Sequence, residues 1–289
     1  RARFAARWRK CVTSFKAAVV QMRSSRDAQE NVRIARELIR DAAAAGADFI
    51  ATPENTPLME SEREKIALFA DGQSQTVIAE FRALAEEIGK WLLLGSLAVP
   101  APDGRFANRS YLFNPQGKIA AQYDKIHMFD AQVSDGERYQ ESRNFRAGHE
   151  AVLAELPWGK LGMSVCYDVR FAYLYRALGQ AGAQFLSVPS AFTKVTGQAH
   201  WHILLRARAI ETGCYVFAPA QGGRHENGRE TYGHSLIVDP WGRIIAEAGE
   251  EPSVAIAKID LQEVERARAR IPSLAHDSVF GAPQLTSPS

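Results

Sequence analysis

The sequence predicts an α/β fold in a single domain, and three observations support that prediction. Short apolar runs of strand length alternate with longer segments whose apolar residues recur at helical spacing. No linker, internal repeat or second compositional block divides the 289 residues. Several of the apolar runs also end at a residue that could carry chemistry, which is where α/β enzymes place catalytic groups.

The N-terminal half begins with an apolar run over residues 15–22 that predicts a buried strand. Residues 27–45 follow with Val32, Ala35 and Ile39 at helical spacing, and Gly46 is the expected end of that helix. The further elements expected here are a strand at 49–51, a helix at 74–88, a strand at 91–97 and two strands between 108 and 122 joined by a turn at 114–117.

The C-terminal half continues the alternation and then becomes rich in strands. Its predicted elements are a strand pair at 151–156 and 160–165, a helix after residue 170, a strand at 185–188, a helix at 198–212 that ends at Gly213, and strands at 215–220, 234–238, 243–246 and 254–259.

Composition excludes several classes of function. The chain is 46% apolar and 24% charged with a net charge of +2, which favours neither nucleic acid nor an anionic membrane as a partner. No apolar run approaches the roughly 20 residues that span a bilayer. The three cysteines cannot all pair and match no metal-binding spacing, so a cytoplasmic protein without a metal or other cofactor is expected.

The first 16 residues contain six basic residues and no acidic one. That pattern is typical of an organellar transit peptide, and it fits a solvated leader or an upstream extension equally well. The predicted organisation is a basic extension at 1–14, a catalytic domain at 15–275 and a tail at 276–289.

Cys166 stands at the end of the apolar stretch Gly-Met-Ser-Val and is followed by Tyr-Asp-Val-Arg-Phe, which opens a helical segment. A thiol at such a strand-to-helix turn is expected to meet a helix N-terminus, where the thiolate is favoured. Glu54 follows the strand at 49–51, and Lys125 follows the strands between 108 and 122. Together they would supply a nucleophile, a base and an electrophile.

These three segments, in this order and spacing, resemble the nitrilase superfamily of carbon–nitrogen hydrolases from about Phe15 to Leu274. The resemblance implies a four-layer α-β-β-α sandwich, subunits that pair into a homodimer or higher homo-oligomer, and a Glu54–Lys125–Cys166 triad. It also implies that Glu141, in the segment Tyr-Gln-Glu-Ser, is a second glutamate near the triad, although a surface acid in a polar loop is the alternative.

The chemistry expected of this triad is acyl transfer through a thioester. Glu54 would take the thiol proton as Cys166 attacks a carbonyl or nitrile carbon. Lys125 and the backbone N–H of Tyr167 would stabilise the oxygen that becomes negative. Ammonia or an amine would leave, and water activated by the same glutamate would release the acid.

The segments from 189 to 235 resemble the ω-amidase-like branch, and the stretch from Ala220 to Ser235 is most similar to deaminated glutathione amidases. The implied substrate is a small anionic amide. The first alternative activity is that of an ω-amidase acting on 2-oxoglutaramate, and the next is that of a nitrilase or an N-carbamoyl amino acid hydrolase. Outside hydrolysis, a catalytically idle binding module and a redox thiol protein are the alternatives. Arg170 is the first expected substrate contact, unless it pairs with Asp168 instead. Further candidates are Lys194 and Thr196, which are expected on the loop after a strand, and then Gln221 and Arg224.

The histidines predict no metal site. His200 and His202 lie two residues apart on a predicted helix and would not face one direction, and His127, His225 and His234 are scattered along the chain. His202 also differs from the related sequences, which commonly have glutamate at this position.

Overall fold

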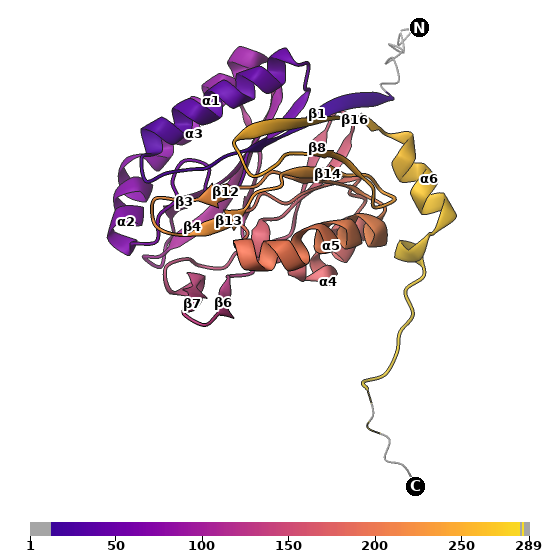
Figure 1. Cartoon of the computed structure of the whole chain (residues 1–289). Helices are drawn as coiled ribbons and strands as arrows, with labels where there is room; N and C mark the ends of the chain where they lie inside the picture. The colour runs from indigo at the N-terminus through magenta and orange to yellow at the C-terminus, as the bar shows by residue number, and fades with distance from the viewer. Residues whose placement is uncertain (1–12, 284, 286–289) are drawn as a thin grey trace, which may run out of the picture.

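Two six-stranded β-sheets packed face to face form the centre of the protein (Figure 1). The structure is a computed structural model, and it describes residues 13–283 and 285. In spatial order, the first sheet contains β16 (Ser253–Asp260), β1 (Ser14–Gln21), β2 (Phe49–Ala51), β3 (Trp91–Pro100), β4 (Phe106–Phe113) and β5 (Ile119–Asp124). The second contains β15 (Ile244–Glu247), β14 (Leu236–Val238), β11 (Tyr215–Ala218), β10 (Phe185–Ser187), β9 (Gly159–Met163) and β8 (Val152–Leu156).

Helices cover the outer face of each sheet. The first sheet packs against α1 (Ala28–Ala44) and α3 (Ser74–Ile88), and the second against α4 (Ala172–Gln180) and α5 (Lys194–Thr212), as Figure 1 shows. The expected four-layer α-β-β-α sandwich is therefore confirmed.

The alternation of side chains along β1 explains how one strand belongs to two cores. Ala17 and Val19 pack into the core between the sheets, whereas Ala18 and Val20 pack into the core under α1 and α3. A strand buried on both faces has a continuous apolar sequence, because neither face can carry polar side chains. This double burial is why the run at 15–22 was recognisable as a central strand.

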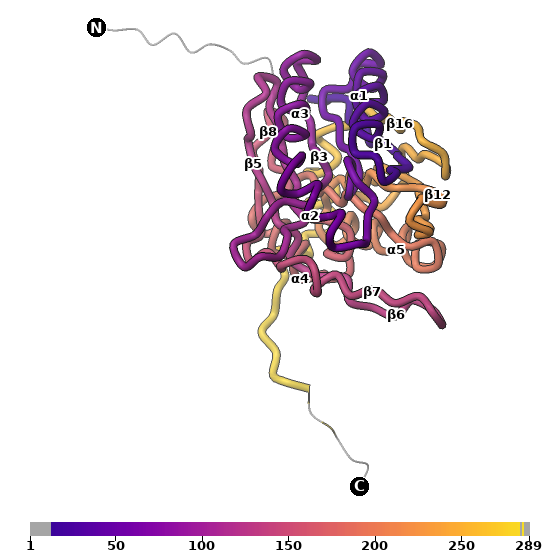
Figure 2. Tube along the Cα trace, turned by 90° about the vertical axis from the view of Figure 1, so that its left-hand side faces the viewer, coloured from indigo at the N-terminus to yellow at the C-terminus, as the bar shows by residue number. Residues whose placement is uncertain are grey.

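Several elements were absent from the sequence-based prediction. They are the helices α2 (Arg63–Gly72) and α6 (Gln262–Arg270), the hairpin of β6 (Asp130–Ser134) and β7 (Glu137–Gln140), and the hairpin of β12 (Gly222–Arg224) and β13 (Glu230–Tyr232). The hairpin β6–β7 projects from the body of the molecule (Figure 2). The strands of both hairpins are only three to five residues long and contain mostly polar residues, so their sequences show no alternating apolar pattern.

The helix α5 begins at Lys194, four residues before the predicted start. Thr193 caps it, since the Thr193 hydroxyl accepts a hydrogen bond from the Thr196 amide. Gly197 lies in the first turns because a Cβ there would be 2.2 Å from the Cβ of Tyr232. A glycine that weakens the helical pattern in the sequence is thus required by the close packing of α5 on β13.

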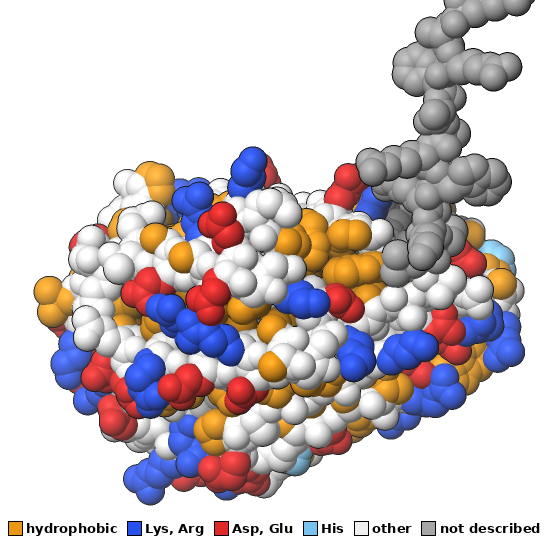
Figure 3. All heavy atoms as spheres, turned by 90° about the horizontal axis from the view of Figure 1, so that it is seen from above, with side chains coloured by type: hydrophobic (Ala, Val, Ile, Leu, Met, Phe, Trp, Pro, Cys, Tyr) orange, Lys and Arg blue, Asp and Glu red, His pale blue; other side chains and the backbone are white. Residues whose placement is uncertain are grey.

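Acidic and basic side chains are interleaved over the face shown in Figure 3. Ion pairs also connect the outer helices, such as Arg33–Glu37 within α1 and Arg40–Glu87 between α1 and α3. None of the helices described within residues 13–283 is long and apolar enough to cross a membrane. The expected extension at 1–14, with Cys11, falls almost wholly outside the described residues.

Candidate active site

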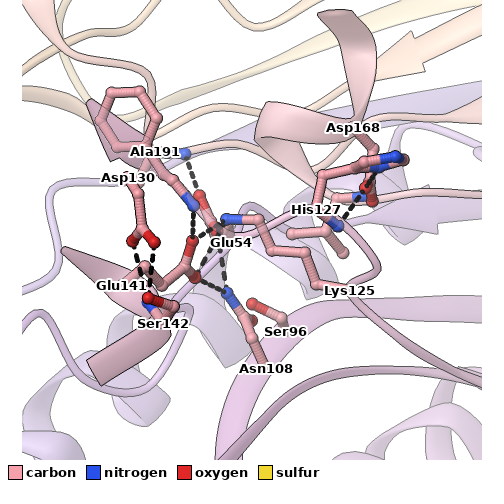
Figure 4. Close-up of polar contacts among 12 residues, drawn as sticks. Glu54, Ser96, Asn108, Lys125, His127, Asp130, Glu141, Ser142, Asp168 and Ala191 are labelled. Carbon is pink, nitrogen blue, oxygen red and sulfur yellow. Dashed lines mark hydrogen bonds and ion pairs between the residues drawn. The ribbon is translucent and has the colours of Figure 1, made fainter. Parts of the chain in front are cut away.

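The three predicted segments meet at one cavity, which Glu54, Lys125 and Cys166 all line. Figure 4 shows the carboxylates of Glu54 and Glu141 directed at the ammonium group of Lys125. Its Nζ is 2.9 Å from Oε1 of Glu54, and it is 3.0 and 2.8 Å from the two carboxylate oxygens of Glu141. Lys125 directly follows β5, Glu54 follows β2, and Glu141 opens a 3₁₀ helix at Glu141–Arg143 after β7. The second glutamate therefore lies in contact with Lys125 rather than on the surface.

Backbone and side-chain amides complete the carboxylate contacts. Asn108, on β4, donates from Nδ2 to Glu54 at 2.9 Å and to Glu141 at 3.2 Å. The Ala191 N–H donates to the other oxygen of Glu54 at 2.8 Å, and the Phe129 N–H donates to Glu141 at 2.7 Å. These donors fix both carboxylates independently of Lys125.

Burial makes the charges of this cluster interdependent. The side chains of Lys125 and Glu54 are only 2% and 4% exposed. Burial alone would lower the pKa of Lys125, but Glu141 and Glu54 raise it above its ordinary value. Burial would likewise raise the pKa of Glu54, but Lys125 and Arg229 bring it below the ordinary value. These opposing effects favour the Lys125 ammonium ion beside the Glu54 carboxylate.

Cys166 occupies a strained turn immediately after β9. Its φ of 51° is in the left-handed region, which is costly for a residue with a side chain. Two hydrogen bonds hold the turn: the Cys166 N–H donates to the carbonyl of Pro189 at 2.9 Å, and the Val165 N–H donates to the Asp168 carboxylate at 2.8 Å. Tyr167 is the next residue of a short 3₁₀ helix, Cys166–Arg170, and its amide belongs to the first turn.

The expectation that a helix N-terminus favours the thiolate is wrong for this resting state. The helix after Cys166 is a single 3₁₀ segment, which aligns few peptide dipoles. Burial raises the pKa of the Cys166 thiol, the Glu54 carboxylate raises it further, and Lys125 opposes them only in part. The thiol is therefore protonated beside an ionised carboxylate.

Asp168 fixes the nucleophile turn and is a residue that sequence reasoning considered only as a partner for Arg170. It is fully buried and accepts hydrogen bonds from the Tyr123 hydroxyl at 2.8 Å and from the His127 backbone N–H at 3.0 Å. The His127 ring also contacts it at 2.7 Å through Nδ1. Because its oxygens are occupied in this way, Asp168 does not pair with Arg170.

A cavity of about 430 Å³ opens over the cluster. Glu54, Lys125, Glu141 and Cys166 all line it, together with Arg229. A much smaller cavity of about 10 Å³ shares Cys166 and Arg229 with the first. A groove of about 490 Å³ between α1 and α3 is larger, but it is lined by apolar residues such as Val32 and Val77 and by ion-paired side chains, and it contains none of these residues.

Arg229, between β12 and β13, is the main residue of this site that sequence reasoning missed. Its guanidinium carbon lies 5.2 Å from the centre of the Tyr139 ring, and its Nη2 donates to the Ala191 carbonyl. Its buried Nε has no hydrogen-bond partner among residues 13–283. The prediction considered Arg224, five residues earlier, which is exposed and lines neither cavity.

The other expected substrate contacts divide into two groups. Arg170 and Thr196 line the small cavity beside Cys166, and the Arg170 guanidinium lies 5.1 Å from the centre of the Phe192 ring. Lys194 lines neither cavity and lies 3.9 Å from Glu230. Lys194 and Thr196 both belong to the first turn of α5, not to a loop as expected.

Gln221 is buried and supports the Glu54 segment. Its Nε2 donates to the Glu54 carbonyl at 3.1 Å and to the Ser24 hydroxyl at 2.8 Å. Asn108 has a comparable supporting role, and its sequence gives no signal of it, because Arg109 and Ser110 on the same strand are polar as well.

The description of His234 as scattered is also corrected by the structure. His202 and His234 both contact Glu247, so these three side chains form a cluster.

Comparison with known sequences is consistent across the chain. The family model described as carbon–nitrogen hydrolase matches residues 16–269. A Synechocystis protein named deaminated glutathione amidase is 42% identical over 269 residues, which are 90% of this chain and 97% of that protein. A human protein of the same name is 39% identical over 264 residues, with coverage of 90% and 81%.

Solved structures agree with the sequence comparison. The NitFhit protein of Caenorhabditis elegans superposes with a TM-score of 0.85 at 37% identity, covering 92% of this chain and 65% of that chain. A Saccharomyces cerevisiae member of the nitrilase superfamily superposes with a TM-score of 0.82 at 29% identity, covering 90% and 95%.

Proposed function

The chain belongs to the carbon–nitrogen hydrolase family, and we propose that it hydrolyses the amide of a small anionic substrate, with deaminated glutathione as the first candidate. In that compound the glutamyl amine of glutathione has become a ketone. Hydrolysis gives 2-oxoglutarate and cysteinylglycine. The observation that carries the proposal is the buried Glu54–Lys125–Glu141 cluster, which lines one cavity together with Cys166.

In the first step, Glu54 takes the proton of the Cys166 thiol while the sulfur attacks the amide carbonyl carbon. A protonated thiol beside an ionised carboxylate is the pair that this step needs. The carbonyl oxygen becomes negative near Lys125 and the Tyr167 amide. Three carboxylate oxygens already lie within 3.0 Å of Nζ, so Lys125 would contribute mainly positive charge, and the Tyr167 amide a hydrogen bond.

In the second step, the carbon–nitrogen bond breaks as the leaving amine takes the proton held by Glu54. A thioester joins the acyl group to Cys166. Glu54, ionised again, removes a proton from water, whose oxygen attacks the thioester carbon and releases the acid and the free thiol. Glu141 would keep Lys125 at its position through both steps.

The charge of the cavities supports an anionic substrate. Deaminated glutathione has one carboxylate on the acyl side of the amide and another on the leaving side. Arg229 lines both cavities beside Cys166, and Arg170 lines the smaller one. Because a guanidinium group can bind a carboxylate through two parallel hydrogen bonds, we assign these two arginines as carboxylate contacts, with Thr196 beside them.

The test is steady-state hydrolysis of deaminated glutathione and 2-oxoglutaramate side by side. We expect a higher kcat/KM for deaminated glutathione and no activity in Cys166→Ala. Arg229→Gln should raise KM by about 10- to 100-fold, since one charge-assisted contact is worth about 1.5–3 kcal/mol. Arg224→Gln is the matched control and should behave as wild type.

A preference for 2-oxoglutaramate would keep the mechanism and make the chain an ω-amidase. Turnover of neither compound would contradict the proposed substrate.

Three further parts of the proposal concern the whole protein. The catalytic domain would span residues 15–275, in line with the family match at 16–269. A reducing compartment such as the cytoplasm would keep Cys166 reduced. The chain would form a homodimer or a larger homo-oligomer through the outer face of α4 and α5, where Tyr173, Ile203 and Ile210 are exposed.

A further inference from the structure

Two imidazoles and one carboxylate meet outside the two cavities beside Cys166. His202 lies on α5, His234 lies between β13 and β14, and Glu247 is the last residue of β15. Oε1 of Glu247 is 2.9 Å from Nε2 of His202 and 2.9 Å from Nδ1 of His234. All three potential ligand atoms lie within 4.8 Å of one another. None of the three residues lines the cavities beside Cys166.

The backbone around His234 holds its ring in place. His234 has a φ of 55°, a left-handed conformation that a residue with a side chain adopts only when its surroundings impose it. Its N–H donates to the Gly249 carbonyl at 3.0 Å, and its carbonyl accepts from the indole N–H of Trp201 at 2.9 Å. Trp201 is fully buried and directly precedes His202, so the positions of the two histidines are coupled through α5.

Aromatic packing orients both rings further. The Tyr232 ring stacks on the His234 ring with their centres 4.4 Å apart, and it meets the His202 ring edge-on at 5.8 Å. Tyr232 is itself fixed against α5 by its contact with Gly197. The rings thus have an apolar wall on one side, while side-chain exposures of 25–34% leave the other side open to solvent.

The donor set is the one that borderline transition metals prefer. Two imidazole nitrogens and one carboxylate oxygen form a three-ligand site that leaves a position for water, as in zinc enzymes with two histidines and one glutamate. A tetrahedral Zn²⁺ ion with bonds of about 2.1 Å holds its ligand atoms about 3.4 Å apart. Because the three ligand atoms lie within 4.8 Å of one another, a pair of them needs to approach by about 1.4 Å at most. The ion would replace the protons that the two nitrogens now direct at Glu247.

We propose that His202, His234 and Glu247 form a binding site for one Zn²⁺ or similar divalent transition-metal ion, which ties α5 to the strands β14 and β15. The three ligands line neither cavity beside Cys166, so we expect the ion to act on the packing of these elements and not on the reaction at Cys166. It would join three elements that are separated by up to 45 residues in the sequence and would stabilise their packing in the folded state.

The experiment measures Zn²⁺ binding by isothermal titration calorimetry to the Cys166→Ala protein, so that the catalytic thiol cannot contribute a ligand. We expect one ion per chain and a higher melting temperature when Zn²⁺ is added. His202→Gln and Glu247→Gln should each weaken Zn²⁺ binding at least tenfold. Loss of a group that only hydrogen-bonds to a metal ligand lowers metal affinity by about 10- to 100-fold, and loss of the ligand itself should lower it at least as much. His200→Gln is the matched control: it lies two residues away on α5, contacts Arg170 instead, and should bind Zn²⁺ as its parent does.

Co²⁺ gives an independent readout of the ligands. A four-coordinate Co²⁺ site with nitrogen and oxygen donors should absorb in the visible region, and this absorption should vanish in His202→Gln and persist in His200→Gln. The proposal is overturned if the parent protein takes up no ion, or if both ligand variants bind Zn²⁺ with unchanged affinity while remaining folded by circular dichroism.

Discussion

At the residue scale, Lys125 is the charge on which the whole cluster depends. Replacing it by methionine would leave Glu54 and Glu141 facing each other in a buried site with no cation between them. Removing one partner of a buried ion pair costs about 3–5 kcal/mol, because the remaining charge keeps its desolvation penalty. Lys125→Met should therefore lower the free energy of unfolding by about that amount, measured by urea denaturation.

Lys194→Met is the matched control for this prediction. Lys194 lies 3.9 Å from Glu230 with both side chains more than 40% exposed, and such pairs contribute about 0–1 kcal/mol. Equal losses of stability in the two variants would show that the buried charges of the cluster are not the cause.

The protonation state of Cys166 makes a prediction about pH. Burial and Glu54 raise the pKa of the thiol, while Lys125 and Arg229 keep the pKa of Glu54 below its ordinary value against the effect of burial. The reactive thiol–carboxylate pair consequently persists from below pH 5 to above pH 8.5. We expect kcat/KM to be flat across that range, with no rise near 8.5, the ordinary pKa of cysteine.

Glu54→Gln should change the profile in a defined way. Without the base, the rate should fall by about 10²- to 10⁴-fold and then increase with pH as thiolate forms. A wild-type profile that rises around pH 8.5 would mean that the thiolate, not the thiol–carboxylate pair, is the reactive form.

At the scale of elements, the hairpin β12–β13 carries Arg229 to the cavity and is held by a buried histidine. His225 contacts the Ser24 carbonyl at 2.8 Å through Nδ1 and the Thr231 hydroxyl at 2.7 Å through Nε2. Burial lowers the pKa of His225 to about 4. The unfolded chain, with an ordinary histidine pKa of about 6.5, then binds more protons than the folded chain between pH 6.5 and 4.

Stability should therefore fall as the pH is lowered through that window, by up to about 3 kcal/mol at 1.36 kcal/mol for each pKa unit. His225→Asn should be less stable at pH 7 but should lose less stability on acidification. Urea denaturation at pH 7, 6 and 5 measures how the free energy of unfolding changes with pH in the wild type and in the variant. An equal change in the two proteins would exclude His225 as the acid-sensitive group.

At the scale of the whole molecule, the sequence predicts what depends on short segments and misses what depends on distant contacts. The central strand β1 and the helix α1 were predictable because burial imposes a pattern on their own residues. Glu54, Lys125 and Cys166 each follow a predicted strand, but their roles were inferred from the family resemblance of the three segments, which also implied the order of the layers.

Contacts between distant segments leave no pattern in the sequence of either segment. Arg229 reaches the cavity because the hairpin β12–β13 carries it there, and strands of three residues are too short to show an alternating apolar pattern. His202 and Glu247 are 45 residues apart, so the argument that His200 and His202 face different directions could not reveal their meeting. The protonated state of Cys166 likewise depends on burial, which no local motif encodes.

The proposed self-association belongs to this largest scale, and the exposed apolar residues of α5 provide its test. Ile203 is 68% exposed and Ile210, two turns further along the same helix, is 53% exposed. A glutamate at position 203 would place a charge inside any interface formed by this face, at a cost of several kcal/mol. Ile203→Glu should therefore reduce the mass measured by light scattering, whereas Leu68→Glu on α2, at a site that is 72% exposed, should leave it unchanged. If both variants keep the mass of the wild type, subunits do not pair through α5; a wild-type mass of 31.9 kDa would exclude association altogether.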